Sequence, residues 1–264
     1  MKLLLELRFD GRNYHGWQVQ KNAPSVQKTL QNAAEELLKR GVKVTGCSRT
    51  DAGVHALSYF CTLESTALDG FPADKLPAAL NVLLPGDVAV KRAAAVNKEF
   101  HPRYDALAKE YIYRIYNGPV RDPFLDGRVW MLPGRRIDEE KMNDGAKALI
   151  GVHDFTSFCA AGGRIEDKTR EVYACEVKRQ GDEVLLRISA DGFLYNMVRI
   201  VAGTLYDCAA GRKEDVRSIL GARDRARAGR TAPPQGLYLN RVLYEGPEAD
   251  AFFADARKAF EKTT

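Results

Sequence analysis

The chain has 264 residues, of which 45% are hydrophobic and 28% charged. This composition is typical of a folded protein with a sizeable core and excludes a mainly disordered chain. The net charge of +5 permits a polyanionic partner without requiring one. The five cysteines form no CxxC pair, so they indicate neither a zinc site nor a disulfide framework and favour reduced thiols in the cytoplasm.

No apolar run approaches the ~18 residues of a membrane-spanning helix. The opening MKLLLEL is interrupted by Glu6 and lacks a small-residue cleavage site, so it is typical of a strand and not of a signal peptide. The alternation of apolar and polar residues continues from Lys2 to Asp10, which predicts a half-buried strand.

The rest of the first half predicts helices and strands in turn. Ser25 can cap a helix whose apolar stripe lies within 26–38 and which Gly41 ends. Strands are expected at 42–45, 58–63 and 88–96, and a helix at 74–84.

The second half repeats this rhythm. Strands are expected at 110–117, 171–179, 183–190 and 237–245, and the second and third of these should form a hairpin around Gly181 and Asp182. Helices are expected at 138–150, 194–210 and 214–220. Each half has roughly the ferredoxin-like β-α-β-β-α-β order, which predicts an α+β fold. The domains expected are 1–104, 105–247 and a C-terminal helix at 248–264.

The sequence GCSRTDAGVHA, from Gly46 to Ala56, places the acid Asp51 in a turn of small residues. Small neighbours leave room for a bulky group, and the adjacent Arg49 can keep the carboxylate ionised or hold an anion. The alternative is an ordinary turn in which the aspartate side chain accepts bonds from nearby backbone N–H groups. The residues alone favour neither interpretation.

The segment RTDAGVHA resembles the signature of the tRNA pseudouridine synthase A family. Six more segments are similar to the family in the same order along the chain: FDGRNYHGWQVQ, NVLLPGDVAV, FHPRYDALAKEYIYRIYN, HDFTSF, FLYNMVRIVAGTL and TAPPQGLYL. A lone RTD tripeptide carries little information, but seven ordered segments form a specific pattern.

The resemblance implies an isomerase that converts uridine to pseudouridine at nucleotides 38–40 of the tRNA anticodon stem-loop. It implies no cofactor and a homodimer. The implied fold joins two ferredoxin-like halves into a mixed, largely antiparallel sheet, with helices on one face and an RNA-binding cleft. Two alternatives stay open: a tRNA-binding chaperone without catalysis, and a pseudouridine synthase that acts on another RNA.

The resemblance also assigns residues. Asp51 aligns with the catalytic aspartate, and Tyr111 with the active-site tyrosine that stacks on the target base. Arg199 aligns with the arginine that pairs with the aspartate, and Arg49 with an arginine associated with RNA and base flipping. From periodicity alone, Tyr111 is a core residue and Arg199 a solvated helical arginine.

The sequence departs from the family at a few positions. Ser48 stands where many relatives have glycine, and Tyr195 and Asn196 stand where many have basic residues or histidine. Neither departure touches the three aligned catalytic residues. The departure at Tyr195 and Asn196 puts local contacts with tRNA in doubt.

The reaction breaks the C1′–N1 bond of uridine and joins C1′ to C5. Nothing is oxidised or hydrolysed, so the chemistry needs no metal or redox cofactor. An ionised carboxylate such as Asp51 can act as nucleophile or stabilise charge. Attack on C1′, attack on the ring and a glycal route all stay open, and Tyr111 is a candidate base or proton relay for C5. The enzyme must also flip the uridine out of its stack.

Basic residues outside the motif are candidate RNA contacts: Arg12, Lys21, Arg164, Lys168 and Arg170. The run 223–230 adds Arg225 and Arg227, for which a solvated helix end is an equal alternative. The four histidines have no HxxxH or HExxH spacing, so no metal site is predicted.

Overall fold

The computed structural model describes residues 1–134, 136–162 and 165–245. The chain divides into two compact units. Unit 1 comprises Met1–Leu107 together with the described residues from 239 onward, and unit 2 comprises Ala108–Tyr238. The boundary falls at Leu107 where 104 was expected, and most of the last strand belongs to unit 1 although it was expected in the second half. The C-terminal helix predicted at 248–264 lies outside the described residues.

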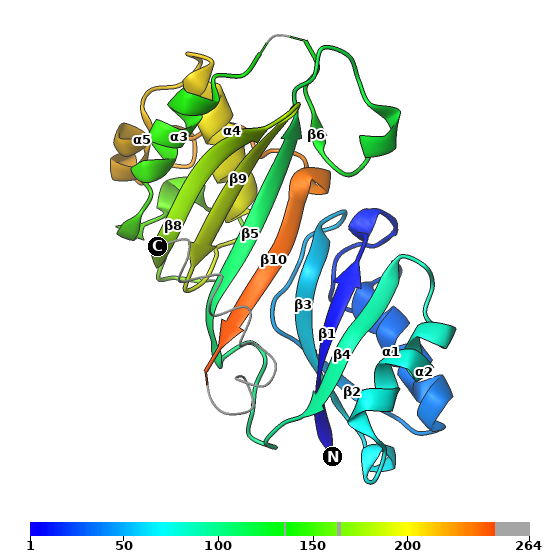
Figure 1. The fold of residues 1–264 in the computed structure, drawn as a ribbon. Helices are drawn as coiled ribbons and strands as arrows, with labels where there is room; N and C mark the ends of the chain where they lie inside the picture. The colour runs from blue at the N-terminus through cyan, green and yellow to red at the C-terminus, as the bar shows by residue number, and fades with distance from the viewer. Residues whose placement is uncertain (135, 163–164, 246–264) are drawn as a thin grey trace. The chain divides into compact units, whose positions relative to one another are not determined.

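Unit 1 has the predicted β-α-β-β-α-β order (Figure 1). Its elements are β1 (Lys2–Phe9), α1 (Val26–Leu38), β2 (Lys43–Gly46), β3 (His55–Glu64), α2 (Leu76–Leu83) and β4 (Val88–Ala95). The strands lie in the order β4-β1-β3, β2 pairs with one end of β3, and these pairs are antiparallel. Strand β10 (Leu237–Tyr244) is the other neighbour of β3. The α+β prediction is confirmed for this unit.

Two local predictions in unit 1 need correction. Strand β1 is buried on both faces, since Leu4 and Glu6 are as enclosed as the alternating leucines. Lys91, Arg92 and Ser58 bind the Glu6 carboxylate, which is how a charged residue is tolerated there. Ser25 caps α1 as predicted, but the helix ends before Gly41, with Lys39 in the left-handed conformation.

Unit 2 also combines antiparallel strands with helices. Its elements are β5 (Ala106–Tyr116), β6 (Trp130–Met131), α3 (Glu139–Lys147), β7 (Gly151–Asp154), β8 (Thr169–Gln180), β9 (Glu183–Ala190), α4 (Met197–Ala209) and α5 (Val216–Ala222). The strands lie in the order β5-β9-β8-β7, antiparallel throughout, and the short β6 runs parallel to β5. The predicted β8–β9 hairpin at Gly181 is confirmed. Strands β6 and β7 were not predicted.

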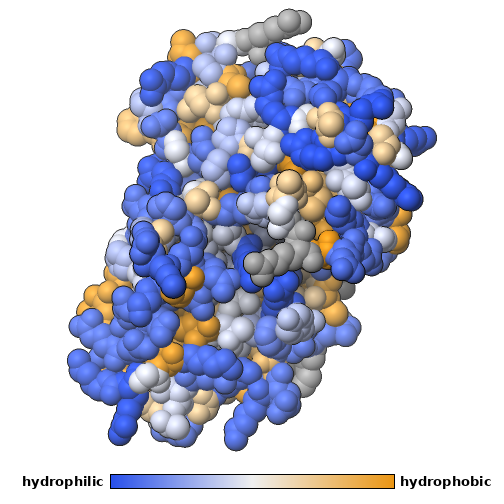
Figure 2. Space-filling model, turned by 180° about the vertical axis from the view of Figure 1, so that it is seen from behind, coloured by the Kyte–Doolittle hydropathy of each residue, from blue (hydrophilic) through white to orange (hydrophobic). Residues whose placement is uncertain are grey.

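Helix α4 packs with α3 and α5 in the helical layer of unit 2 (Figure 1). Residues 200–205 of α4 are all buried, which is more than one full helical turn. The helix is therefore enclosed on every side over this stretch. Hydrophilic residues cover most of the face in Figure 2, and hydrophobic residues occur there in small groups. Within the described residues, no helix is long and apolar enough to cross a membrane.

The start of α3 provides a test of stability against pH. Glu139 accepts a hydrogen bond from Arg179 at 3.0 Å, and chiefly this bond lowers the pKa of Glu139 from 4.5 to about 2. A lowered folded-state pKa contributes stability above the unfolded-state pKa, and the contribution is lost as pH falls from 4.5 to about 2. We expect Glu139→Gln to be less stable than wild type by about 1–2 kcal/mol at pH 7, after allowance for solvent screening.

The difference between Glu139→Gln and wild type should shrink across this acid range in urea denaturation. Glu140→Gln, an exposed neighbour on the same helix, is the matched control and should change little. An equal difference in unfolding free energy between Glu139→Gln and wild type at pH 7 and pH 2 would contradict a stabilising role for the ionised Glu139.

Candidate functional site

Asp51 lies in unit 1, in the turn that joins β2 to β3. Its carbonyl accepts a hydrogen bond from the Val54 N–H at 3.2 Å, and Gly53 has φ +78. Only glycine adopts such a φ without strain, so Gly53 permits the turn. Asp51 is half-buried and Arg49 is exposed. The predicted turn of small residues is therefore present.

Residues 10–17, which we call the supporting loop, pack directly against this turn. The Gly53 N–H donates to the Tyr14 carbonyl at 3.1 Å, and the Gly11 N–H donates to Nδ1 of His55 at 3.1 Å. A Cβ on Gly11 would lie 2.0 Å from the Val54 carbonyl oxygen. The two backbones can approach this closely only because glycine stands at the contact.

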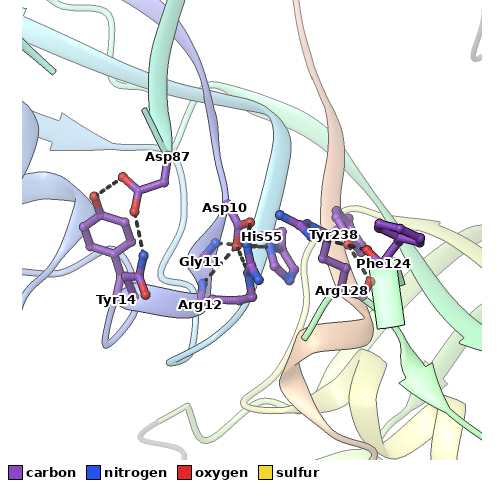
Figure 3. A network of polar contacts seen from close by, with 10 residues as sticks. Asp10, Gly11, Arg12, Tyr14, His55, Asp87, Phe124, Arg128 and Tyr238 are labelled. Atoms are coloured by element: carbon purple, nitrogen blue, oxygen red, sulfur yellow. Dashed lines mark hydrogen bonds and ion pairs between the residues drawn. The ribbon is translucent and has the colours of Figure 1, made fainter. Parts of the chain in front are cut away.

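Asp87, just before β4, anchors the supporting loop from the other side (Figure 3). Its carboxylate accepts hydrogen bonds from the Tyr14 hydroxyl at 2.6 Å and from the Asn13 amide at 3.0 Å. Its backbone oxygen accepts one from the Asp10 N–H at 2.9 Å. Burial and the Asp87 carboxylate raise the pKa of Tyr14, so its hydroxyl stays protonated and remains a donor.

Asp10 lies beside the strand that follows the turn. One of its oxygens lies 3.2 Å from Nδ1 of the buried His55, and both oxygens bind the Arg12 guanidinium at 2.8–3.0 Å. Burial raises the pKa of Asp10, but the hydrogen bonds from Arg12 outweigh it and the net shift is downward. Arg12, a predicted RNA contact, is thus engaged with Asp10 in this structure.

An aromatic pair supports the beginning of the turn. The rings of Trp17 and Tyr59 stack with centroids 4.2 Å apart, and the Tyr59 hydroxyl donates to the Ser48 carbonyl. A Cβ on Gly46 would lie 2.2 Å from the Tyr59 hydroxyl oxygen. Position 48 contributes its backbone to this contact, so the contact itself does not depend on whether serine or glycine stands there.

Tyr111 lies in unit 2, on β5 and opposite Ile188 of β9. It is buried, as the strand pattern predicted. Its ring meets the ring of Phe193 edge to face, with centroids 5.0 Å apart. Phe193 belongs to the segment that joins β9 to α4, so this segment orients Tyr111.

Arg199 also lies in unit 2, in the first turn of α4. Its Nε donates to the Ala232 carbonyl at 2.8 Å, and its Nη1 donates to the side-chain oxygen of Asn196 at 2.8 Å. The Ala232 N–H donates in turn to the Arg199 carbonyl at 3.0 Å. The periodicity indicated a solvated arginine, but this one is half-buried and held by two acceptors.

The segment around Ala232 is itself held by a hydrogen bond from β5. The Tyr113 hydroxyl of β5 donates to the Pro233 carbonyl at 2.7 Å. Arg199 binds the carbonyl of the preceding residue, Ala232, so Tyr113 and Arg199 hold the same segment. Burial raises the pKa of Tyr113, and the charge of Arg199 acts in the opposite direction. Tyr111, two residues away on the same strand face, and Arg199 therefore belong to one region of unit 2.

The basic residues at 223–230 are largely committed to the fold. Arg225 donates to the Gly229 carbonyl at 2.9 Å and to the Thr231 hydroxyl at 3.0 Å. Nε and Nη2 of Arg227 donate to the two carboxylate oxygens of Glu214, at 2.7 and 2.6 Å. These contacts favour a structural role over phosphate binding for both arginines.

The other predicted RNA contacts are more dispersed. Lys21 is exposed, Lys168 is half-buried, and Arg170 donates to the Asp167 carbonyl at 3.2 Å. Arg164 lies outside the described residues. No group of three or more His, Cys, Asp or Glu that could hold a metal ion occurs among the described residues.

Sequence reasoning did not single out Tyr14 and Asp87, whose side chains hold the supporting loop, and it did not foresee the contact between Asn196 and Arg199. Tyr14 and Asp87 belong to segments already matched to the family, so their signal was available, but their pairing depends on tertiary structure. Asp51 is in unit 1, whereas Tyr111 and Arg199 are in unit 2.

Comparisons with known proteins agree on one family. The family model described as tRNA pseudouridine synthase matches residues 7–105 and 146–245. The chain is 43% identical over 250 residues to tRNA pseudouridine synthase A of Ruminiclostridium cellulolyticum, covering 92% of this chain and 99% of that one. It is 41% identical over 249 residues to the Bacillus subtilis protein of the same name, covering 93% and 100%.

A solved structure, that of a Cbf5-Nop10-Gar1 complex, aligns with 96% of this chain and 66% of that chain. Its TM-score of 0.37 and 14% identity are too low to support a conclusion. The family match and the relatives are independent of it. Because the family model matches most of the chain and the relatives are 41–43% identical over nearly their whole length, this chain belongs to the tRNA pseudouridine synthase family.

Proposed function

We propose that the protein isomerises uridine to pseudouridine in the anticodon stem-loop of tRNA, at nucleotides 38–40, with Asp51 as the essential carboxylate. The C1′–N1 bond breaks and a C1′–C5 bond forms, C5 loses its proton, and N1 gains one. The substrate and product are isomers, so the reaction consumes no co-substrate.

The observation that carries this proposal is the setting of Asp51. A half-buried aspartate lies in a turn that is fixed by backbone contacts to the supporting loop. Catalytic groups need such support, because a small misplacement of the reacting group costs rate. An ordinary surface aspartate would not need two glycines at the contact points of its turn, Gly11 and Gly16.

Tyr111 and Arg199 are the proposed active-site tyrosine and arginine. Both side chains are oriented by neighbours in unit 2, Tyr111 by Phe193 and Arg199 by Asn196 and Ala232. A fixed guanidinium favours the ionised form of a nearby carboxylate, and an aromatic ring suits an extruded base. The exposed Arg49 is the proposed contact for base flipping.

The test is tritium release from tRNA labelled at C5 of uridine, with no added metal or nucleotide, followed by mapping of the modified positions. Release at nucleotides 38–40 is the expected result. Tight tRNA binding without release would favour the chaperone, and release from other nucleotides or another RNA would favour a different target. Either outcome would overturn the proposal.

We also propose a homodimer in the cytoplasm, on the family resemblance and the dispersed cysteines. A second subunit could contact parts of the tRNA that lie beyond one anticodon arm. Light scattering at micromolar concentration should give twice the chain mass of 29.4 kDa. A monomeric mass would contradict the dimer.

A further inference from the structure

We propose that Asn196 is a positioning residue whose side-chain oxygen fixes the orientation of the Arg199 guanidinium for pseudouridine formation. The inference rests on the proposed function, in which Arg199 is the active-site arginine. Asn196 does not itself need to touch the substrate. Three observations in unit 2 carry the argument: the backbone of Asn196, the use of its side chain, and the way in which Arg199 is held.

The backbone of Asn196 is unusual for its place. It has φ 60 and ψ 10, in the left-handed region. Among the described residues, the other non-glycine residues with positive φ are Lys39 and Arg223, and both end helices, where this conformation is common. Asn196 instead precedes a helix, where the residue is normally extended.

A turn accounts for part of this conformation. The Met197 N–H donates to the Leu194 carbonyl at 3.1 Å, so Asn196 is the third residue of a turn. Positive φ at that position favours glycine or asparagine. Glycine meets the requirement with the smaller strain, so the turn explains why the choice is limited to these two residues but not why asparagine is used.

The side chain gives the reason for asparagine. A residue before a helix usually accepts a hydrogen bond from the first turn, and Asn is among the best residues for it. Within the described part of the chain, the Asn196 side chain makes no such capping bond to α4. Its oxygen instead accepts the hydrogen bond from Nη1 of Arg199 at 2.8 Å.

Arg199 is held in a defined plane as a result. Nη1 binds Asn196, and Nε binds the carbonyl of Ala232, which comes from a distant segment. When two nitrogens of a planar guanidinium each donate to a separate acceptor, the orientation of the group is fixed as well as its position. Loss of the Asn196 oxygen would remove one of the contacts that set the plane of the guanidinium, while the contact of Nε to Ala232 would remain.

The segment that joins β9 to α4 also contacts Tyr111, the other candidate residue of unit 2. Phe193 contacts Tyr111, and the Tyr195 carbonyl accepts a hydrogen bond from the Ala160 N–H at 3.0 Å, which ties the segment to a neighbouring loop. A substitution that disturbed the turn would therefore affect Tyr111 as well. The decisive variant must keep the turn while it removes the side-chain oxygen.

Asn196→Gly meets this condition, because glycine adopts the same backbone without strain. We expect kcat for pseudouridine formation to fall about 10- to 100-fold, KM for tRNA to change less than about threefold, and the Tm to stay equal or rise. Asn196→Ala should lose similar kcat with a lower Tm, because alanine lacks the oxygen and is strained in this turn.

A double-mutant cycle with Arg199→Lys tests whether Asn196 acts through Arg199. Arg199→Lys alone should lower kcat, and adding Asn196→Gly to it should cause little further loss. Wild-type kcat in Asn196→Gly, wild-type kcat in Arg199→Lys, or losses that multiply in the double variant would each overturn the inference. If wild-type protein forms pseudouridine normally, such results refute only the role of Asn196 or Arg199, whereas its failure to do so refutes the proposed function.

Discussion

Asp51→Asn should lower pseudouridine formation by about 10³-fold or more, while tRNA binding changes by less than about threefold. Asparagine keeps the size of the side chain and its place in the turn, but it is a poor nucleophile and carries no charge. The bonds that hold the turn come from the backbones of Gly53 and Gly11, so they do not depend on the carboxylate. The variant should therefore fold normally.

Tritium release and a filter-binding titration of the same preparation measure the two effects separately. Asp74→Asn is the matched control, because Asp74 is an exposed acid of unit 1 whose ion pair with Lys75 spans 3.9 Å. It removes the same charge and should leave both values unchanged. Retention of more than about a tenth of wild-type activity in Asp51→Asn would refute an essential carboxylate.

Gly16→Ala should unfold unit 1 at markedly lower urea, with a loss of about 3 kcal/mol or more. Gly16 has φ +83, which costs alanine about 1–2 kcal/mol. A Cβ would also lie 2.1 Å from the Thr50 carbonyl oxygen, and such crowding adds about 1–3 kcal/mol. Because Thr50 precedes Asp51, any relief of the clash moves the candidate catalytic turn, so activity should fall further than stability alone would cause.

Gly70→Ala separates the cost of the positive φ from the cost of crowding by an added Cβ. Gly70 has the same φ of +83, but beyond Gly70 itself and its two chain neighbours no atom of the described chain lies within 4 Å of the position that an added Cβ would take. This control should lose only the conformational part, about 1–2 kcal/mol, and should keep full activity. Equal stability losses in the two variants would show that the packing of Gly16 against Thr50 contributes nothing.

Local signals in the sequence predicted most of the regular structure. The Ser25 cap and the β8–β9 turn at Gly181 depend on residues close together in the chain, and both were found where expected. The short β6 and β7 have too few residues to display a period. Helix α4 was predicted from 194 but begins at Met197, because Asn196 adopts positive φ.

The candidate site was less predictable than the fold. The motif indicated Asp51, but periodicity misjudged Arg199, because the acceptor at Ala232 lies 33 residues away in the chain. Arg227 has the sequence context of a solvated helix end, yet its Nε and Nη2 both donate to the Glu214 carboxylate. Polar pairs between distant segments leave no local pattern, so only the three-dimensional structure reveals them.

The division of β10 between the units has a consequence for synthesis. Residues 239–245 belong to unit 1, where β10 is the neighbour of β3. Unit 1 is therefore incomplete until the ribosome has made all of residues 108–238 of unit 2. At typical translation rates of about 5–20 residues per second, this delay is on the order of ten seconds.

During that interval, β3 presents unpaired backbone groups where β10 will later bind. A nascent chain with such an edge is open to pairing with another nascent chain on the same messenger RNA. Unit 2 lies between the two parts of unit 1 in the sequence, so its folding shortens the flexible chain that separates β3 from the late strand. The order of the segments thus makes folding of the first unit depend on the second.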